Sequence, residues 1–192
     1  MRTVKREELL PLEAYERSRP ELRPALMEAK RRRRVHVGDH LTFLFENAAT
    51  VRYQVQEMVR AEKMTRDADV QHELDTYNEL LGGEGELGCT LLIEIAEPAD
   101  RDVKLRAWLG LPGHLYAELE DGTRVRPSFD ARQVGDDRLS SVQYLKFDVR
   151  GQVPVALGSD LPAHVVAARL DSEQREALRQ DLSVGVAGGG AK

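Results

Sequence analysis

Apolar residues recur at helical spacing between positions 48 and 81, and together with the apolar run before them they predict a strand followed by two helices. The repeating positions are Val51, Val55, Met58 and Val59 in the first helix, and Val70, Leu74, Tyr77 and Leu81 in the second. The link at 65–69 is short and polar. We therefore expect the two helices to form an antiparallel hairpin.

Strand patterns dominate the second half of the chain. Apolar and polar residues alternate at 115–120, 145–149 and 153–157, as in strands with one buried face. The nearly continuous apolar run at 89–96 predicts a central strand, in which Glu94 would point toward a packed face. Shorter strands are expected at 35–37 and 41–46, and a last one at 165–170.

Proline, glycine and capping residues set the other boundaries. A helix is expected over 6–17, and Pro20 is expected to open another one. The segment 158–162 has the composition of a loop, and Asp171 should cap a closing helix. Helices that are segregated from strand hairpins predict an α+β fold: amino-terminal helices and a helical hairpin packed on a mainly antiparallel sheet, with a closing carboxy-terminal helix.

Length and composition predict the class of the protein. With 192 residues we expect a single domain over 1–184 and a disordered tail at 185–192. Apolar residues make up 41% and charged residues 32% of the chain, as in soluble globular proteins. No secretory signal or membrane span is visible, so a cytoplasmic location and no contact with membranes are expected. One cysteine, Cys89, excludes a disulfide within the chain and a cysteine-cluster metal site.

The net charge of −5 is unevenly distributed. Residues 1–36 hold eleven Lys/Arg against six Asp/Glu, while the remainder holds seventeen against twenty-seven. Five consecutive cations at 30–34 could bind phosphates. However, no aromatic residues interleave with them, and cations at the end of a helix also complement its dipole. We therefore favour a structural role for this run and expect no nucleic-acid binding.

Polar side chains flank the two helical stripes, and they are our candidate ligand-binding residues: Glu46, Arg52, Gln56, Glu57, Glu73 and Asn78. Donors and acceptors at the margin of a core suit a small polar or anionic ligand. Arg52 would hold an anion, because a guanidinium offers a planar fork of donors. The alternative interpretation is that these side chains lie on solvated helix faces and form pairs within the helices.

Catalytic and metal-binding motifs do not appear in the sequence. It contains no GxSxG, HExxH or Walker pattern, and the glycine-rich stretch at 82–86 comes after a predicted helix and is not followed by one, so it is not a dinucleotide-binding fingerprint. We predict no metal and no cofactor: the Glu-x-x-His pairs of di-iron bundles are missing, and a turn at Gly38 separates His36 from His40. An acid–base site made of Glu, Arg and Tyr leaves no spacing signature, so the question whether the protein is an enzyme stays open.

Several segments resemble the bacterial family catalogued as domain of unknown function 3501: LTFLFENAATVRYQVQEMVRAE, ELDTYNELL, TLLIEI and GSDLP. RYQVQEM and ELDTYN are the most specific, and the resemblance covers nearly the whole chain. Leu161 stands where the family's late motif tends to carry a histidine. The resemblance implies gene neighbours that encode rubrerythrin-type di-iron proteins and iron–sulfur oxidoreductase-like proteins, without an established reaction.

Two functional hypotheses follow. The first is a non-catalytic accessory or binding protein with a protein partner in a bacterial redox or iron system. The second is an enzyme or small-ligand-binding domain with a polar Arg/Glu/Gln pocket at the helical hairpin.

Overall fold

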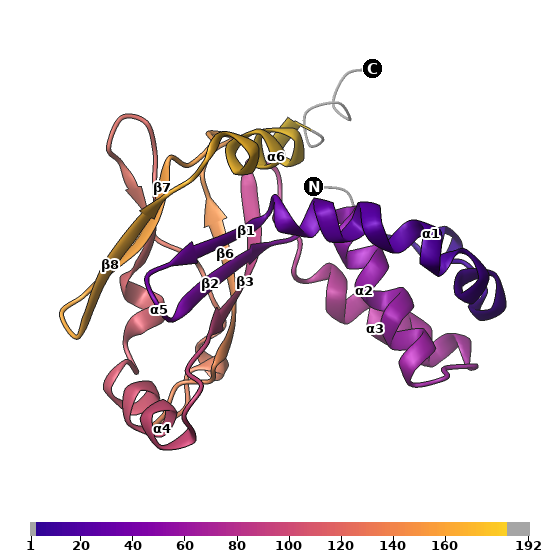
Figure 1. The fold of residues 1–192 in the computed structure, drawn as a ribbon, viewed down its shortest axis with the longest axis horizontal. Helices are drawn as coiled ribbons and strands as arrows, with labels where there is room; N and C mark the ends of the chain where they lie inside the picture. The colour runs from indigo at the N-terminus through magenta and orange to yellow at the C-terminus, as the bar shows by residue number, and fades with distance from the viewer. Residues whose placement is uncertain (1–2, 184–192) are drawn as a thin grey trace.

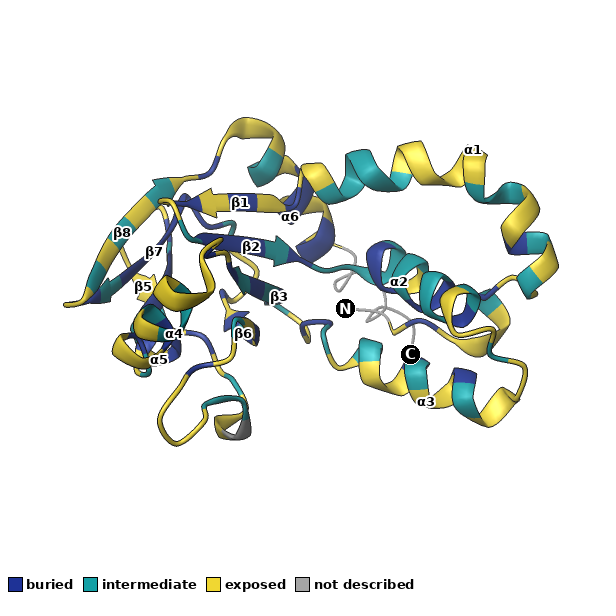
Figure 2. Cartoon of the chain, turned by 60° about the horizontal axis from the view of Figure 1, so that its bottom comes forward, coloured by how far each residue is buried: buried dark blue, intermediate teal, exposed yellow. Residues whose placement is uncertain are grey.

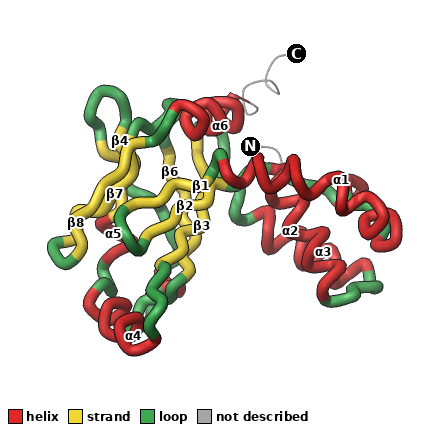
Figure 3. Tube along the Cα trace, viewed as in Figure 1, coloured by secondary structure: helices red, strands yellow, loops and turns green. Residues whose placement is uncertain are grey.

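The computed structural model describes residues 3–183 except for the side chain of Arg132, so the predicted tail at 185–192 lies outside the described residues. Figures 1 and 3 show the order and arrangement of the helices and strands. The α-helices are α1 (Leu12–Arg31), α2 (Ala48–Ala61), α3 (Asp67–Asn78), α4 (Pro98–Ala107), α5 (Leu111–His114) and α6 (Ser172–Ser183). The strands are β1 (Arg34–Val37), β2 (Leu41–Phe45), β3 (Glu86–Ile93), β4 (Leu115–Glu118), β5 (Arg124–Val125), β6 (Val142–Asp148), β7 (Ala156–Leu161) and β8 (His164–Arg169). Single-turn 3-10 helices lie at Arg6–Glu8 and Ala131–Gln133.

The strands form two four-stranded sheets, ordered β1-β2-β3-β6 and β5-β4-β7-β8. Every neighbouring pair is antiparallel. The α+β class and the closing helix are thereby confirmed, although the strands divide into two sheets where we expected one.

One apolar core joins the two sheets. Alternate side chains of the first sheet, such as Phe43 and Leu91, belong to the same buried cluster as Leu115 and Leu157 of the second sheet. Leu178 of α6 joins this cluster. The period-two pattern in the sequence therefore marks the inward faces of both sheets. We call the two sheets with α4, α5 and α6 the body.

The first three helices lie beside the sheets and form what we call the arm, made of residues 3–31 and 48–78 (Figure 1). The predicted hairpin of α2 and α3 is confirmed, and it has a small core of its own. The buried residues of this core are Val4, Leu9, Val51, Val55, Val59, Val70, Leu74 and Leu81. Valine and leucine at helical spacing thus pack α2 on α3, while the chain's first residues close the core. Exposed residues cover much of the outer surface of α1 and α3 (Figure 2).

α1 corrects our prediction of two separate helices. It runs through Pro20 and Pro24 without a break. A proline inside a helix removes one backbone hydrogen bond and bends the axis, and α1 curves along its length (Figure 2). Tyr15, buried near its start, and contacts with α2 hold the helix together across the prolines.

Two further local predictions were wrong. The segment expected to be a loop at 158–162 instead contributes Gly158–Leu161 to β7. Glu94 lies just beyond β3 and is exposed. No helix formed within residues 3–183 is both long and apolar enough to cross a bilayer. That residues 1–184 form one domain stays a prediction.

Candidate functional site

Two of the predicted site residues bind the backbone of the amino-terminal segment. The buried Gln56 accepts from the Leu10 amide through Oε1 at 2.6 Å and donates to the Leu10 carbonyl through Nε2 at 3.2 Å. Asn78 bonds both backbone groups of Val4 in the same way, at 2.8 Å each. Each side-chain amide therefore bonds both the N–H and the C=O of one residue, as a neighbouring strand would. Gln56 in this way holds the amino-terminal segment to α2, and Asn78 holds it to α3.

Glu57 connects α2 to α1. Its carboxylate accepts two bonds from Arg19, at 2.7 and 2.9 Å, and one from the Tyr15 hydroxyl at 2.7 Å. The bonds from Arg19 lower the pKa of Glu57 to about 2, against the opposing effect of burial. Burial, together with the bond to Glu57, raises the pKa of Tyr15. This ion pair holds two helices of the arm together.

Glu46 lies at the junction between arm and body, where β2 leads into α2. Thr50 donates to its Oε2 at 2.5 Å, and burial raises the pKa of the carboxyl group. Beside it, Asn47 caps α2 and donates to Asp181 of α6 at 2.9 Å. Arg33 binds the same Asp181 carboxylate with two bonds of 2.7 and 2.8 Å. These polar groups connect α1, α2 and α6 inside the junction.

Glu46→Gln is expected to stabilise the protein at alkaline pH. Because the folded-state pKa of Glu46 is raised, the folded protein binds more protons than the unfolded chain, and stability falls as pH rises through that pKa. Glutamine keeps an acceptor for Thr50 and carries no charge. The Tm of the variant should exceed that of the wild type by a few degrees near pH 8, and the gain should vanish toward pH 4.

The control for this experiment is Glu21→Gln, which replaces an exposed carboxylate of α1. It should change the Tm little at any pH. A constant loss of stability in Glu46→Gln across the pH range would contradict the expectation.

Arg52 lies apart from these groups. It is exposed on α2 and lines a small apolar hollow with Leu22, Leu26 and Tyr53. Within residues 3–183 its guanidinium has no ion-pair partner. Glu73 faces a different hollow, described below. The six predicted residues are thus divided between the amino-terminal segment, the α1–α2 contact, the junction and two surface hollows.

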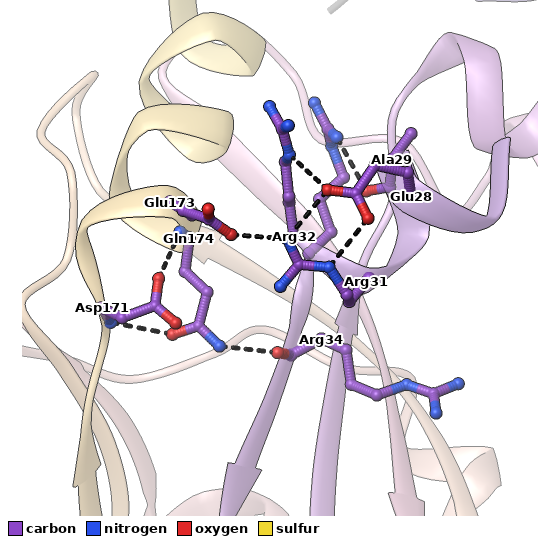
Figure 4. A network of polar contacts seen from close by, with 9 residues as sticks. Glu28, Ala29, Arg31, Arg32, Arg34, Asp171, Glu173 and Gln174 are labelled. Atoms are coloured by element: carbon purple, nitrogen blue, oxygen red, sulfur yellow. Dashed lines mark hydrogen bonds and ion pairs between the residues drawn. The ribbon is translucent and has the colours of Figure 1, made fainter. Parts of the chain in front are cut away.

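The basic run 30–34 is largely engaged in contacts within the chain (Figure 4). Glu28 pairs with both Arg31 and Arg32, and Arg31 also reaches Glu173 of α6. Gln174 donates to the backbone carbonyl of Arg34, whose side chain points away from this group. These contacts attach the end of α1 to α6.

A cleft of about 720 Å³ lies between the arm and the outer face of the first sheet. Its walls are Met58 of α2, Glu73, Thr76 and Tyr77 of α3, Glu79 and Leu80 after it, Cys89 of β3, Tyr144, Leu145 and Lys146 of β6, and Ser128, Phe129, Asp130 and Gln133. Pockets of about 300–1,000 Å³ are typical of small-molecule sites. The cleft therefore has the size of a ligand site.

Of the six predicted residues, Glu73 alone lines this cleft. The sequence did not reveal the cleft for two reasons. Tyr77 is part of the apolar stripe of its helix, and the opposite wall comes from β6, which lies far from α3 in the sequence. The alternation along β6 was the one available signal. Leu145 and Phe147 face inward, so their neighbours in the strand, Tyr144 and Lys146, must face outward.

Two other clusters have structural explanations. Asp160 of β7 binds Nδ1 of His114 at 3.0 Å and the guanidinium of Arg126 at 2.5 Å, and Arg126 lowers the pKa of Asp160 to about 2. Trp108 stacks on His164, with ring centroids 4.2 Å apart. Both clusters connect separate segments of the body. Among the described residues, no group of three or more His, Cys, Asp or Glu is placed to hold a metal ion.

Comparison with known proteins gives a family without an assigned activity. The family model described as "Protein of unknown function (DUF3501)" matches residues 3–182. A crystal structure of a novel protein of unknown function from Burkholderia pseudomallei K96243 is 31% identical, with a TM-score of 0.85, and the match covers 94% of this chain and all of that chain. No curated protein matches the sequence. The chain therefore belongs to the DUF3501 family.

Proposed function

We propose that this protein is a small-ligand-binding protein that acts as a non-catalytic accessory factor, and that the cleft is its ligand site. The observation that carries the proposal is the cleft itself, with its volume of about 720 Å³ and its mixed aromatic and charged walls. Aromatic surfaces supply contact area, and a few polar groups orient a ligand. Family resemblance adds a second element, a partner in a redox system.

The chemistry of the cleft favours binding over catalysis. Its thiol, Cys89, is almost fully buried, and burial raises the pKa of the thiol well above its ordinary value. A protonated thiol is a poor nucleophile. The alternative that the protein is an enzyme stays a prediction. Among the described residues of the cleft, no specific contact favours it.

The position of the cleft suggests how a ligand would act. One wall belongs to α2 and α3 of the arm, and the other belongs to β3 and β6 of the body. A ligand in the cleft would touch both parts and favour one relative position of them. An accessory protein could report an occupied cleft to its partner in this way.

A blocked cleft tests the proposal. Thr76 is exposed on α3 and lines the cleft, and its hydroxyl bonds only the carbonyl of His72 in its own helix. Thr76→Trp should fill the cleft without disturbing the arm. In amide NMR spectra, members of a chemically diverse fragment set should shift the signals of Tyr144 and Lys146 in the wild type and not in Thr76→Trp.

His72→Trp is the matched control, because His72 is exposed one turn earlier on α3 and is not part of the cleft wall. This variant should bind fragments as the wild type does. Fragments that bind only elsewhere, or that bind Thr76→Trp equally well, would refute the proposal.

A further inference from the structure

We infer that the ligand of the cleft is a small organic cation, an ammonium or guanidinium group on an apolar body. This inference rests on the proposed function and specifies its ligand. Three kinds of observation support it: the charge of the cleft wall, the carboxylates that lack partners, and the aromatic rings around them.

The wall of the cleft is acidic. Among the described residues that line it, the ionisable carboxylates outnumber the cations: Glu73, Glu79 and Asp130 against Lys146. Among the side chains that the structure describes, no arginine or histidine lines the cleft. An anionic ligand would therefore meet net repulsion, whereas a cation would be attracted. Our earlier expectation of an anion depended on Arg52, which lies outside the cleft.

Two of these carboxylates are available to a ligand. Among the described side chains, those of Glu73 and Glu79 form no hydrogen bond or ion pair. Some other carboxylates of the arm are engaged: Glu57 pairs with Arg19, and Asp69 pairs with Arg66. Glu73 also stands four residues before Tyr77, so both side chains lie on the same face of α3.

Aromatic rings complete the wall. Tyr77 comes from α3, Tyr144 from β6 and Phe129 from the segment before the second 3-10 helix. The faces of such rings attract a cation and also pack against an apolar body. Burial raises the pKa of Tyr77, and the neighbouring Glu73 and Tyr144 act in the same direction. Tyr77, Glu73 and Tyr144 all line the same cleft, so they would face the same ligand.

Size decides between a small molecule and a larger partner. A volume of about 720 Å³ suits a single drug-sized molecule. The cleft is also lined by the apolar side chains of Met58 and Leu80, which would cover the apolar part of the ligand. We therefore assign the site to an amphipathic amine or guanidine of low molecular mass.

Three probes of the same shape test the charge: phenethylammonium, neutral 2-phenylethanol and anionic phenylacetate. By amide NMR titration the cation should bind in the cleft at least about five-fold more tightly than the alcohol, and the anion should bind more weakly than both. Added salt should reduce the difference between cation and alcohol.

Two variants test the residues. Glu73→Gln should weaken binding of phenethylammonium by about three- to ten-fold while the Tm stays unchanged, because Glu73 has no partner within the described chain. Lys146→Gln should strengthen it about two-fold. Glu62→Gln, which removes a carboxylate at the end of α2 outside the cleft wall, serves as the control and should change neither value.

The outcomes separate this inference from the proposed function. If the neutral or anionic probe binds the cleft as well as the cation does, the cleft is a ligand site and our assignment of its ligand is wrong. If none of the three probes binds there, the assignment is overturned, and the fragment set with Thr76→Trp decides the proposed function independently.

Discussion

Asp181→Asn is expected to destabilise the protein by about 3–5 kcal/mol, which corresponds to a fall in Tm of roughly 6–20 °C for a chain of this length. The Asp181 and Arg33 side chains are only 6% and 9% exposed, and two hydrogen bonds join them. Asparagine has about the same size but no charge. The guanidinium would then stay buried without its counter-ion, which costs more than the lost hydrogen bonds alone.

The double variant Arg33→Met/Asp181→Leu tests the cause. Apolar side chains of similar volume leave no buried charge, so most of the lost stability should return. The exposed pair of Arg179 and Glu176, with both side chains 53% exposed, is the matched control. Glu176→Gln should cost less than about 1 kcal/mol. Chemical denaturation of all four proteins gives the free energies of unfolding.

A double variant as unstable as Asp181→Asn would contradict this explanation. It would mean that the junction is stabilised by the packing of the native side chains, or by the hydrogen bond from Asn47 to Asp181. The junction matters beyond stability, because Asp181 connects the start of α2 to α6 and so fixes where the arm leaves the body.

Periodicity predicted the elements whose stability comes from an apolar face. The hairpin of α2 and α3 and the strand β6 were predicted because one side of each is buried in a core. Their packing repeats at the period of the element itself, so it is visible in a local window of sequence.

Elements that depend on distant contacts were predicted less well. The prolines of α1 favour a helix start, yet contacts with α2 keep one continuous helix through them. The GSD segment of β7 has the composition of a loop. Gly158 lies there because a Cβ atom would stand 2.5 Å from the Tyr116 hydroxyl oxygen on the neighbouring strand. Glycine at this position reflects a close approach, which its sequence neighbours do not reveal.

The candidate site shows the same limit. Gln56 and Asn78 have the chemistry of ligand-binding residues, and the sequence identified them on that basis. Their partners are backbone groups of Leu10 and Val4, 46 and 74 residues away. A polar side chain at the edge of a core serves a ligand or a distant backbone equally well, and only the tertiary structure distinguishes the two.

Gly88→Ala is expected to cause the second large loss of stability. Gly88 lies in β3 opposite Lys146, and the chain that leaves α3 crosses directly over it. A Cβ atom there would lie 1.8 Å from the Leu80 carbonyl oxygen and 2.8 Å from the Gly82 amide nitrogen. Both are backbone atoms, which cannot move aside by a rotamer change.

The methyl group would push the 80–82 segment away from the sheet, and this displacement would affect two sites at once. Leu81 would be drawn out of the arm core, and Leu80 would shift in the cleft. We expect a cost of about 3 kcal/mol, at the upper end for overpacking, together with weaker binding of phenethylammonium. Gly113→Ala, where a Cβ atom meets nothing within 4 Å, is the control and should be neutral. Denaturation and NMR titration of both variants measure these effects. If Gly88→Ala is as stable as Gly113→Ala, the chain between α3 and β3 does not rest on the sheet, and the wall of the cleft that it forms is not fixed there.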